Sequence, residues 1–246
     1  MNSSPGSTYQ PRPMSSRTAY ILGGVAVVII VAIVAYAMHS SSSNSQKVQE
    51  DGYGPVHDPA VSALLDSDGA IVLGKTNPAK TIDMYEDPLC PNCGSLEHYY
   101  GQQIAKEIDA GNLAVRYRMV NFLDSESGTK DYSTRAIAAS DCVASAGDGP
   151  AFSKFHQALF TTKQPSEQGG SLSNDQLAAI AKDAGASEDV QQCIAKGDRV
   201  DEARDHAETA MTALKGAVGQ VQTPTVLQGS TNVDLGSSTW VTSLSK

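Results

Sequence analysis

Four cysteines, Cys90, Cys93, Cys142 and Cys193, are the residues of this chain whose types and spacing point most directly to chemistry. Cys90 and Cys93 form a C-x-x-C, a spacing that suits thiol–disulfide exchange. If this pair opens a helix, unpaired backbone N–H groups and the helix dipole stabilise a thiolate there. A stabilised thiolate attacks disulfides and also leaves readily.

The pair lies between two predicted elements, a strand at 81–86 and a helix at 94–110 with apolar residues at helical spacing. Cys90 is expected at or just before the first turn of the helix, and Cys93 one turn inside and more buried. Pro91 suits the first turn, where its missing N–H costs nothing. This placement predicts an attacking Cys90 and a Cys93 that resolves mixed disulfides from within.

Two other interpretations of the pair remain open. A zinc site needs a second pair of cysteine or histidine ligands at close spacing, and the nearest candidate, His98, has no partner beside it. The cysteine and histidine spacing therefore favours no metal at this pair. A static disulfide between Cys90 and Cys93 is the second alternative.

Cys142 and Cys193 stand alone, each within a predicted helix. An even number of cysteines in an exported domain favours a structural disulfide between these two. The loop that it would close holds about fifty residues, for which the chain-entropy model gives roughly 4 kcal/mol. A second redox pair that relays electrons is the alternative.

The remaining elements place these cysteines in a mixed α/β domain. Strands are expected at 70–73, 81–86, 113–122, 225–227 and 232–235, with helices at 94–110 and 238–244. The segment from about 131 to 219 shows no strand pattern and is expected to form several helices. The fold class is thus α/β with a helical insertion before the last two strands.

The N-terminal segment is expected to anchor the chain in a membrane. Residues 19–38 are twenty uncharged residues, enough for a helix of roughly 30 Å. Arg12 and Arg17 precede it, so residues 1–18 are expected in the cytoplasm and the rest outside. A signal peptide cleaved after Ala37 is the competing interpretation, since residues 35–37 read A-x-A.

A flexible stalk is expected at 39–58, which contains the run SSSSNS, and a folded domain at 59–246. The chain has 18 Lys and Arg against 27 Asp and Glu, a formal charge of −9. This balance argues against nucleic-acid binding, which favours basic surfaces.

The sequence from Tyr85 to Cys93, YEDPLCPNC, and the distant Thr223-Pro224-Thr225 resemble the exported DsbA-type disulfide oxidoreductases. The resemblance covers about residues 59–246, and the anchor and four cysteines are like those of actinobacterial members. It implies a thioredoxin-like fold. It also implies that Cys90 is the nucleophile, Cys93 the resolving cysteine, and Pro224 a cis-proline facing them.

The resemblance further implies that Thr223 offers backbone hydrogen bonds to an extended substrate. Pro91 and Asn92 form the active-site loop, and Asn92 stands where the strongest oxidants of the family have histidine. We therefore expect a weaker oxidant than the family's extreme. Many relatives have a buried acid at the position of Met84. Glu86 or Asp87 is a candidate substitute, although both are expected to be solvated or capping residues.

These features predict a monomeric, membrane-anchored enzyme, without cofactor, that introduces disulfides into exported proteins with free thiols. In families like this one, a quinone-linked membrane protein of the DsbB or VKOR kind reoxidises the pair. A reductase or isomerase on the same fold is the nearest alternative. A non-enzymatic chaperone or binding module, with a static Cys90–Cys93 bridge, is the other.

Overall fold

The protein is described by a computed structural model for residues 52–244. The chain divides into two units, 1–46 and 47–246, and the second contains every described residue. The predicted cytoplasmic tail at 1–18, the predicted anchor at 19–38 and most of the predicted stalk therefore lie outside the described residues. Within residues 52–244, no helix is both long enough and apolar enough to cross a membrane.

A six-stranded sheet in the order β1-β2-β4-β3-β5-β6 organises the domain. Its strands are β1 (Ser62–Leu65), β2 (Ile71–Gly74), β3 (Lys80–Glu86), β4 (Leu113–Met119), β5 (Thr225–Gln228) and β6 (Thr231–Asn232). β3 and β4 are parallel, and the other neighbours are antiparallel. A parallel pair requires a crossover, which α2 (Pro91–Asp109) supplies.

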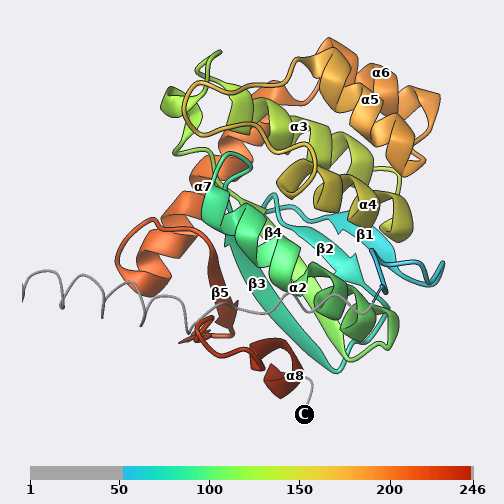
Figure 1. The fold of residues 1–246 in the computed structure, drawn as a ribbon, viewed down its shortest axis with the longest axis vertical. Helices are drawn as coiled ribbons and strands as arrows, with labels where there is room; N and C mark the ends of the chain where they lie inside the picture. Colours follow the sequence, from blue (N-terminus) through green and yellow to red (C-terminus); the bar gives the residue numbers. More distant parts are fainter. Residues whose placement is uncertain (1–51, 245–246) are drawn as a thin grey trace, which may run out of the picture. The chain divides into compact units, whose positions relative to one another are not determined.

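The predicted helical insertion is present between β4 and β5 (Figure 1). It consists of α3 (Tyr132–Ala144), α4 (Gly149–Phe160), α5 (Asn174–Ala184), α6 (Glu188–Lys196) and α7 (Val200–Val218), after a short 3-10 turn η1 (Asp124–Glu126). The last helix is α8 (Trp240–Leu244). Figure 1 shows α2 lying over β3 and β4, with α3, α5 and α6 grouped to one side of the sheet.

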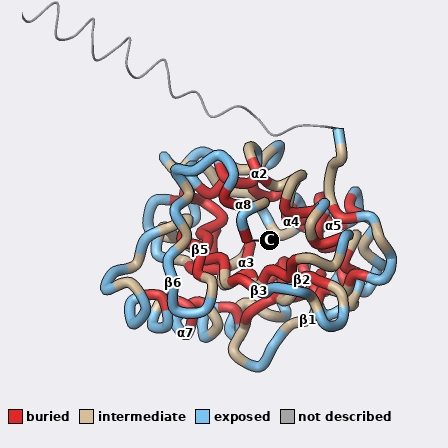
Figure 2. Tube along the Cα trace, turned by 90° about the horizontal axis from the view of Figure 1, so that it is seen from below, coloured by how far each residue is buried: buried red, intermediate tan, exposed pale blue. Residues whose placement is uncertain are grey.

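The sheet is covered on both faces, as the alternation of side chains along β3 requires. Ile82 and Met84 are fully buried in the main apolar cluster, which includes residues of α2 and α4. Tyr85 points the other way and packs with Ala210 and Leu214 of α7 in a second cluster. Figure 2 shows the buried positions along the strands and inner helix faces. Packing on both faces thereby fixes the end of β3, which leads into the C-x-x-C.

Two sequence predictions need correction. β1 was missed because it is a short edge strand with a mixed pattern, in which Ala63 is buried and Leu64 is 57% exposed. The stalk was predicted to reach residue 58, yet Val56 is fully buried and its N–H donates to Ser153 Oγ at 3.0 Å. Tyr53 also donates to Asp109, at 2.8 Å. The domain therefore begins before residue 59.

Candidate active site

Cys90 and Cys93 occupy the junction between β3 and α2, where the strand ends and the helix begins. Cys90 is the N-cap residue, with φ −73° and ψ 117°, and Pro91 is the first helical residue. The helix thus begins at the redox pair, as the expected place of Pro91 in its first turn implies, and three residues before the apolar pattern that starts at Gly94. Both cysteines are free thiols, Cys90 being 6% exposed and Cys93 fully buried.

The surroundings of Cys90 stabilise its thiolate. Hydrogen bonding from the Cys93 thiol is the largest effect, and together with donors from Thr223 and from the backbone of Asn92 and Cys93 it outweighs burial. The pKa of Cys90 falls from 9.0 to about 6. A cysteine with this pKa is mainly ionised near neutral pH, as an attacking or leaving thiolate must be.

The segment before β5 faces Cys90 from across the site. The Thr223–Pro224 peptide bond is cis, as the family resemblance implies. In the dithiol form the Cys90 thiol lies 3.6 Å from the carbonyl oxygen of Thr223. The Thr223 hydroxyl is buried, and no group within residues 52–244 is aligned to hydrogen-bond with it. Its O–H can therefore turn toward the Cys90 thiolate.

An open groove of about 480 Å³ adjoins the cis peptide bond. It is lined by Pro224 and by polar residues of β6 and the loop after it, among them Asn232 and Asp234. Asn92 is exposed at the start of α2. The groove is therefore connected to the reactive sulfur through Thr223, which precedes Pro224 and whose carbonyl oxygen contacts Cys90.

Cys93 has the opposite electrostatic environment. Burial raises its pKa well above 9.0, and the Cys90 sulfur and the Glu86 carboxylate raise it further. Cys93 therefore needs a nearby group to take its proton before it can attack, and to return the proton when it leaves.

Glu86 and Asp87 are fully buried, so the expectation that they are solvated is wrong, whereas Asp87 does cap backbone N–H groups. Burial raises the pKa of each carboxyl to about 7. Asp87 accepts hydrogen bonds from the backbone of Leu89 and Leu123 and from the Ser133 hydroxyl. The loops around the site are thereby tied to Asp87. Glu86 is held differently, by side chains from two helices.

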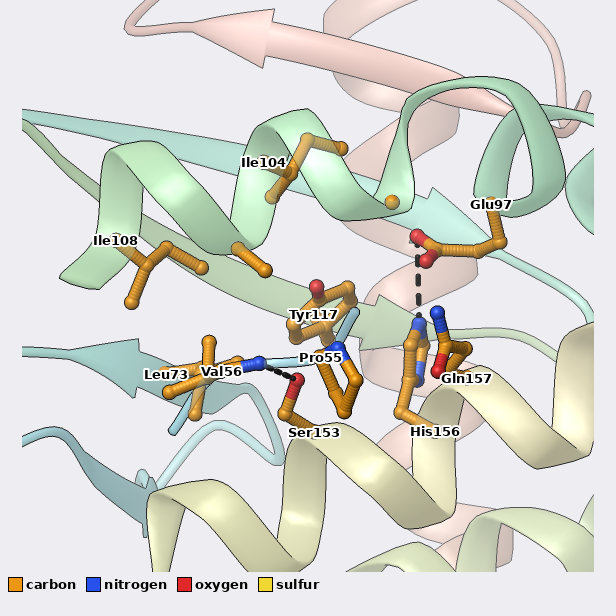
Figure 3. A pocket seen from close by; sticks show the side chains of 12 residues that line it. Pro55, Val56, Leu73, Glu97, Ile104, Ile108, Tyr117, Ser153, His156 and Gln157 are labelled. Carbon is orange, nitrogen blue, oxygen red and sulfur yellow. Dashed lines mark hydrogen bonds and ion pairs between the residues drawn. The ribbon is translucent and has the colours of Figure 1, made fainter. Parts of the chain in front are cut away.

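A buried cluster of Glu86, Glu97 and His156 lies beneath Cys93. His156 Nε2 is 3.3 Å from Glu86 Oε2 and 3.5 Å from Glu97 Oε1. Burial lowers the pKa of His156, but the two carboxylates outweigh it and raise the pKa to about 9. Figure 3 shows the Glu97 carboxylate and the His156 ring facing one another from α2 and α4.

In the sequence, His156 falls on an apolar helix face with Phe152 and Phe160, and Glu97 belongs to no motif. The spacing of Cys93 and Glu97, four residues apart on one helix, could have shown that they share a face. The burial of His156 with Glu86 depends on contacts between β3 and α4, which no local pattern reports. Within residues 52–244, the side chains positioned to hold a metal ion are these three, and not the C-x-x-C with His98.

Gln164, in the loop after α4, contacts the active-site turn from above. Its side-chain amide donates to the carbonyl oxygens of Cys90 at 3.0 Å and Pro88 at 3.2 Å. Gly94 makes this approach possible, because a Cβ there would lie 2.2 Å from Gln164 Oε1 and 2.6 Å from the Phe160 carbonyl oxygen. The helical insertion therefore braces the redox turn directly.

Cys142 and Cys193 form a disulfide that joins α3 to α6, with a Cα–Cα distance of 6.1 Å. Cys142 is buried in the main cluster and Cys193 packs against it. The bridge lies within the insertion, while Cys90 and Cys93 lie at the sheet, so the structure pairs the cysteines as the sequence predicted.

Comparison with known proteins identifies the fold. Residues 66–244 match a family model described as thioredoxin. The structure resembles the MdbA protein of Corynebacterium diphtheriae, a thiol-disulfide oxidoreductase, with 32% identity and a TM-score of 0.68 over 77% of this chain and 95% of that one. It also resembles DsbA from Mycobacterium tuberculosis, at 30% identity and a TM-score of 0.57 over 72% of this chain and 97% of that one.

A curated relative is larger. The chain is 37% identical over 187 residues to the serine/threonine-protein kinase PknE of Mycobacterium tuberculosis. The matched residues make up 75% of this chain. The match spans 33% of the kinase. The similarity therefore concerns about a third of that protein's length.

Proposed function

Because this chain belongs to the thioredoxin family and is a DsbA-type thiol–disulfide oxidoreductase, we propose that Cys90 and Cys93 are its redox pair and that it oxidises exported proteins. The observation that carries the proposal is the asymmetry of the two thiols, one with a pKa lowered to about 6 and the other with a pKa well above 9.0. A stabilised Cys90 thiolate favours the reduced enzyme, so the disulfide form accepts electrons readily.

The proposed reaction begins with the Cys90–Cys93 disulfide. A substrate thiolate attacks Cys90 Sγ, the enzyme's S–S bond breaks, and Cys93 leaves and takes a proton. A second substrate thiolate then attacks the substrate sulfur of the mixed disulfide, and Cys90 leaves as a thiolate. The substrate gains one disulfide, and two electrons remain on the enzyme as one thiolate and one thiol.

Four residues besides the cysteines have defined roles in this reaction. Glu86, buried and electrostatically coupled to Cys93, gives Cys93 its proton and takes it back on reoxidation. Thr223 and Pro224 present backbone to an extended substrate beside the groove. Asn92 lacks the charge of a histidine at the same position, which limits the oxidising strength.

The location and partners form part of the same proposal. The uncharged segment 19–38 anchors the chain, and the domain acts on the far side of the membrane from Arg12 and Arg17. A quinone-linked membrane protein of the DsbB or VKOR kind reoxidises the pair. No cofactor is needed, since both electrons are carried by sulfur.

Equilibration of the full-length protein with glutathione buffers tests the direction of electron flow. We expect a reduction potential between about −180 and −120 mV and rapid oxidation of a reduced, unfolded substrate. A value near about −270 mV would identify a reductase instead. Cys90→Ser is expected to abolish exchange, and retained exchange in that variant would remove the redox pair from the mechanism.

A further inference from the structure

Glu86 can exchange a proton with Cys93, but it is itself fully buried and does not contact solvent. Burial raises its pKa to about 7, so it must exchange protons with water to be protonated before Cys93 leaves and deprotonated before Cys93 attacks. During exchange, the bound substrate protein covers the groove beside Pro224. A second route must therefore connect Glu86 to solvent.

The geometry points to such a route: we infer that His156 and Glu97 carry the proton between Glu86 and the cleft that separates α2 from α4. This inference rests on the proposed function of Cys93 and Glu86. It adds two residues and an exit to that function.

A single nitrogen joins the two carboxylates. Nε2 of His156 lies 3.3 Å from Glu86 Oε2 and 3.5 Å from Glu97 Oε1, so no ring rotation is needed to pass a proton. The imidazolium gives its Nε2 proton to Glu97, and Nε2 then accepts the proton held by Glu86. When Glu97 then releases its proton to water, the cluster regains the charge that it had before Glu86 took the proton of Cys93.

The cluster is built for mobile protons rather than for fixed hydrogen bonds. Both oxygens of Glu86, Oε1 of Glu97 and both ring nitrogens of His156 are buried and lack a well-aligned hydrogen bond within residues 52–244. Burying charged groups without well-aligned hydrogen bonds is costly, so such groups are rarely kept without a role. Their lack of fixed partners leaves each of them able to donate or accept.

Glu97 connects the cluster to water. It lines a partly enclosed cavity of about 10 Å³, roughly the space of one water molecule, together with Tyr117 and His156 (Figure 3). It also lines an open cleft of about 340 Å³ between α2 and α4, next to the exposed His98 and Lys154. A small rotation of one carboxylate therefore reaches both compartments.

The sequence provides the space for this carboxylate. Cys93, Glu97 and Gly101 follow at intervals of four residues on one face of α2. A Cβ on Gly101 would come within 2.9 Å of Glu97 Oε2. The groups that face His156 are Glu86 from β3, Glu97 from α2 and Tyr117 from β4, whose ring centroid lies 4.2 Å away.

The test isolates the step that needs proton transfer. Reduced full-length protein is mixed with oxidised glutathione, the reaction is quenched at intervals, and the products are measured by mass spectrometry. Cys90 first forms a glutathione adduct, and Cys93 then displaces the glutathione. We expect His156→Gln and Glu97→Gln to form the adduct at the wild-type rate but to resolve it about 10²-fold more slowly, with the adduct accumulating. His98→Gln, which changes an exposed histidine of the same cleft, is the matched control.

The two variants also separate a relay from a purely electrostatic effect. Removing the cation at 156 and removing the anion at 97 shift the pKa of Glu86 in opposite directions. A relay requires both variants to slow resolution and to alter its pH profile and solvent isotope effect. Opposite changes, or rates within twofold of the control in folded proteins, would overturn the inference. Failure of the wild type to form the Cys90–Cys93 disulfide with oxidised glutathione would instead contradict the proposed function.

Discussion

Replacing Thr223 with valine should raise the pKa of Cys90 without changing the shape of the site. Four donors lower that pKa from 9.0 to about 6 against burial, and the Thr223 side chain is one of them. A hydrogen bond to a charged group is worth about 1.5 kcal/mol, which corresponds to about one pKa unit. We therefore expect a pKa near 7 in Thr223→Val and little change in Thr223→Ser, which keeps the hydroxyl.

The consequence for reactivity depends on pH. At pH 6 the thiolate fraction of Cys90 should fall from about one half to about one tenth. A thiolate of higher pKa is also more nucleophilic, by about threefold per unit. Alkylation by iodoacetamide should then be about twofold slower than wild type at pH 6 and about threefold faster at pH 8.5. The two rate curves should cross between these values.

Thiolate absorbance at 240 nm, followed from pH 4 to 10 in the reduced protein, measures the pKa directly. The Cys93→Ala variant is the second comparison, because hydrogen bonding from Cys93 is the largest cause of the shift. A wild-type midpoint near 8.5, or a valine variant that titrates like wild type, would refute the account of Cys90.

Three further outcomes are expected. Replacing Cys142 and Cys193 with serine opens a loop with a sequence separation of 51 and should lower the free energy of unfolding by up to about 4 kcal/mol in urea titrations, with exchange retained; full loss of exchange in a folded variant would contradict a structural role. Val56→Ala should cost about 1–3 kcal/mol, whereas a flexible stalk would lose nothing. His156 has a folded pKa of about 9 against an ordinary 6.5, so its contribution to stability is fully present below about pH 6.5 and lost as pH rises toward 9; urea titrations across this range should show the loss, and His156→Gln should flatten it.

The sequence determined the parts of this protein that local rules control. Pro91 and the C-x-x-C placed a helix start at the redox pair. The capping box of Ser173 with Gln176 and the Gly185 that ends α5 are likewise set by neighbours in the sequence. The strand patterns and the long strandless segment were enough to predict an α/β domain with a helical insertion.

Tertiary structure decided the electrostatics of the site. Glu86 and Asp87 read as solvated acids in the sequence, because a short polar pair before a proline is usually exposed. They are buried because α4 and the loop after β4 close over the end of β3.

The partners of the redox pair were likewise fixed by contacts between distant segments. His156 meets Glu86 across 70 residues and Glu97 across 59, and Gln164 reaches back to Cys90. Periodicity reports which face of a helix is apolar, but not which charged residue another element brings against it. The identity of the nucleophile could therefore be predicted from sequence, whereas the groups that handle its partner's proton became visible only in the folded chain.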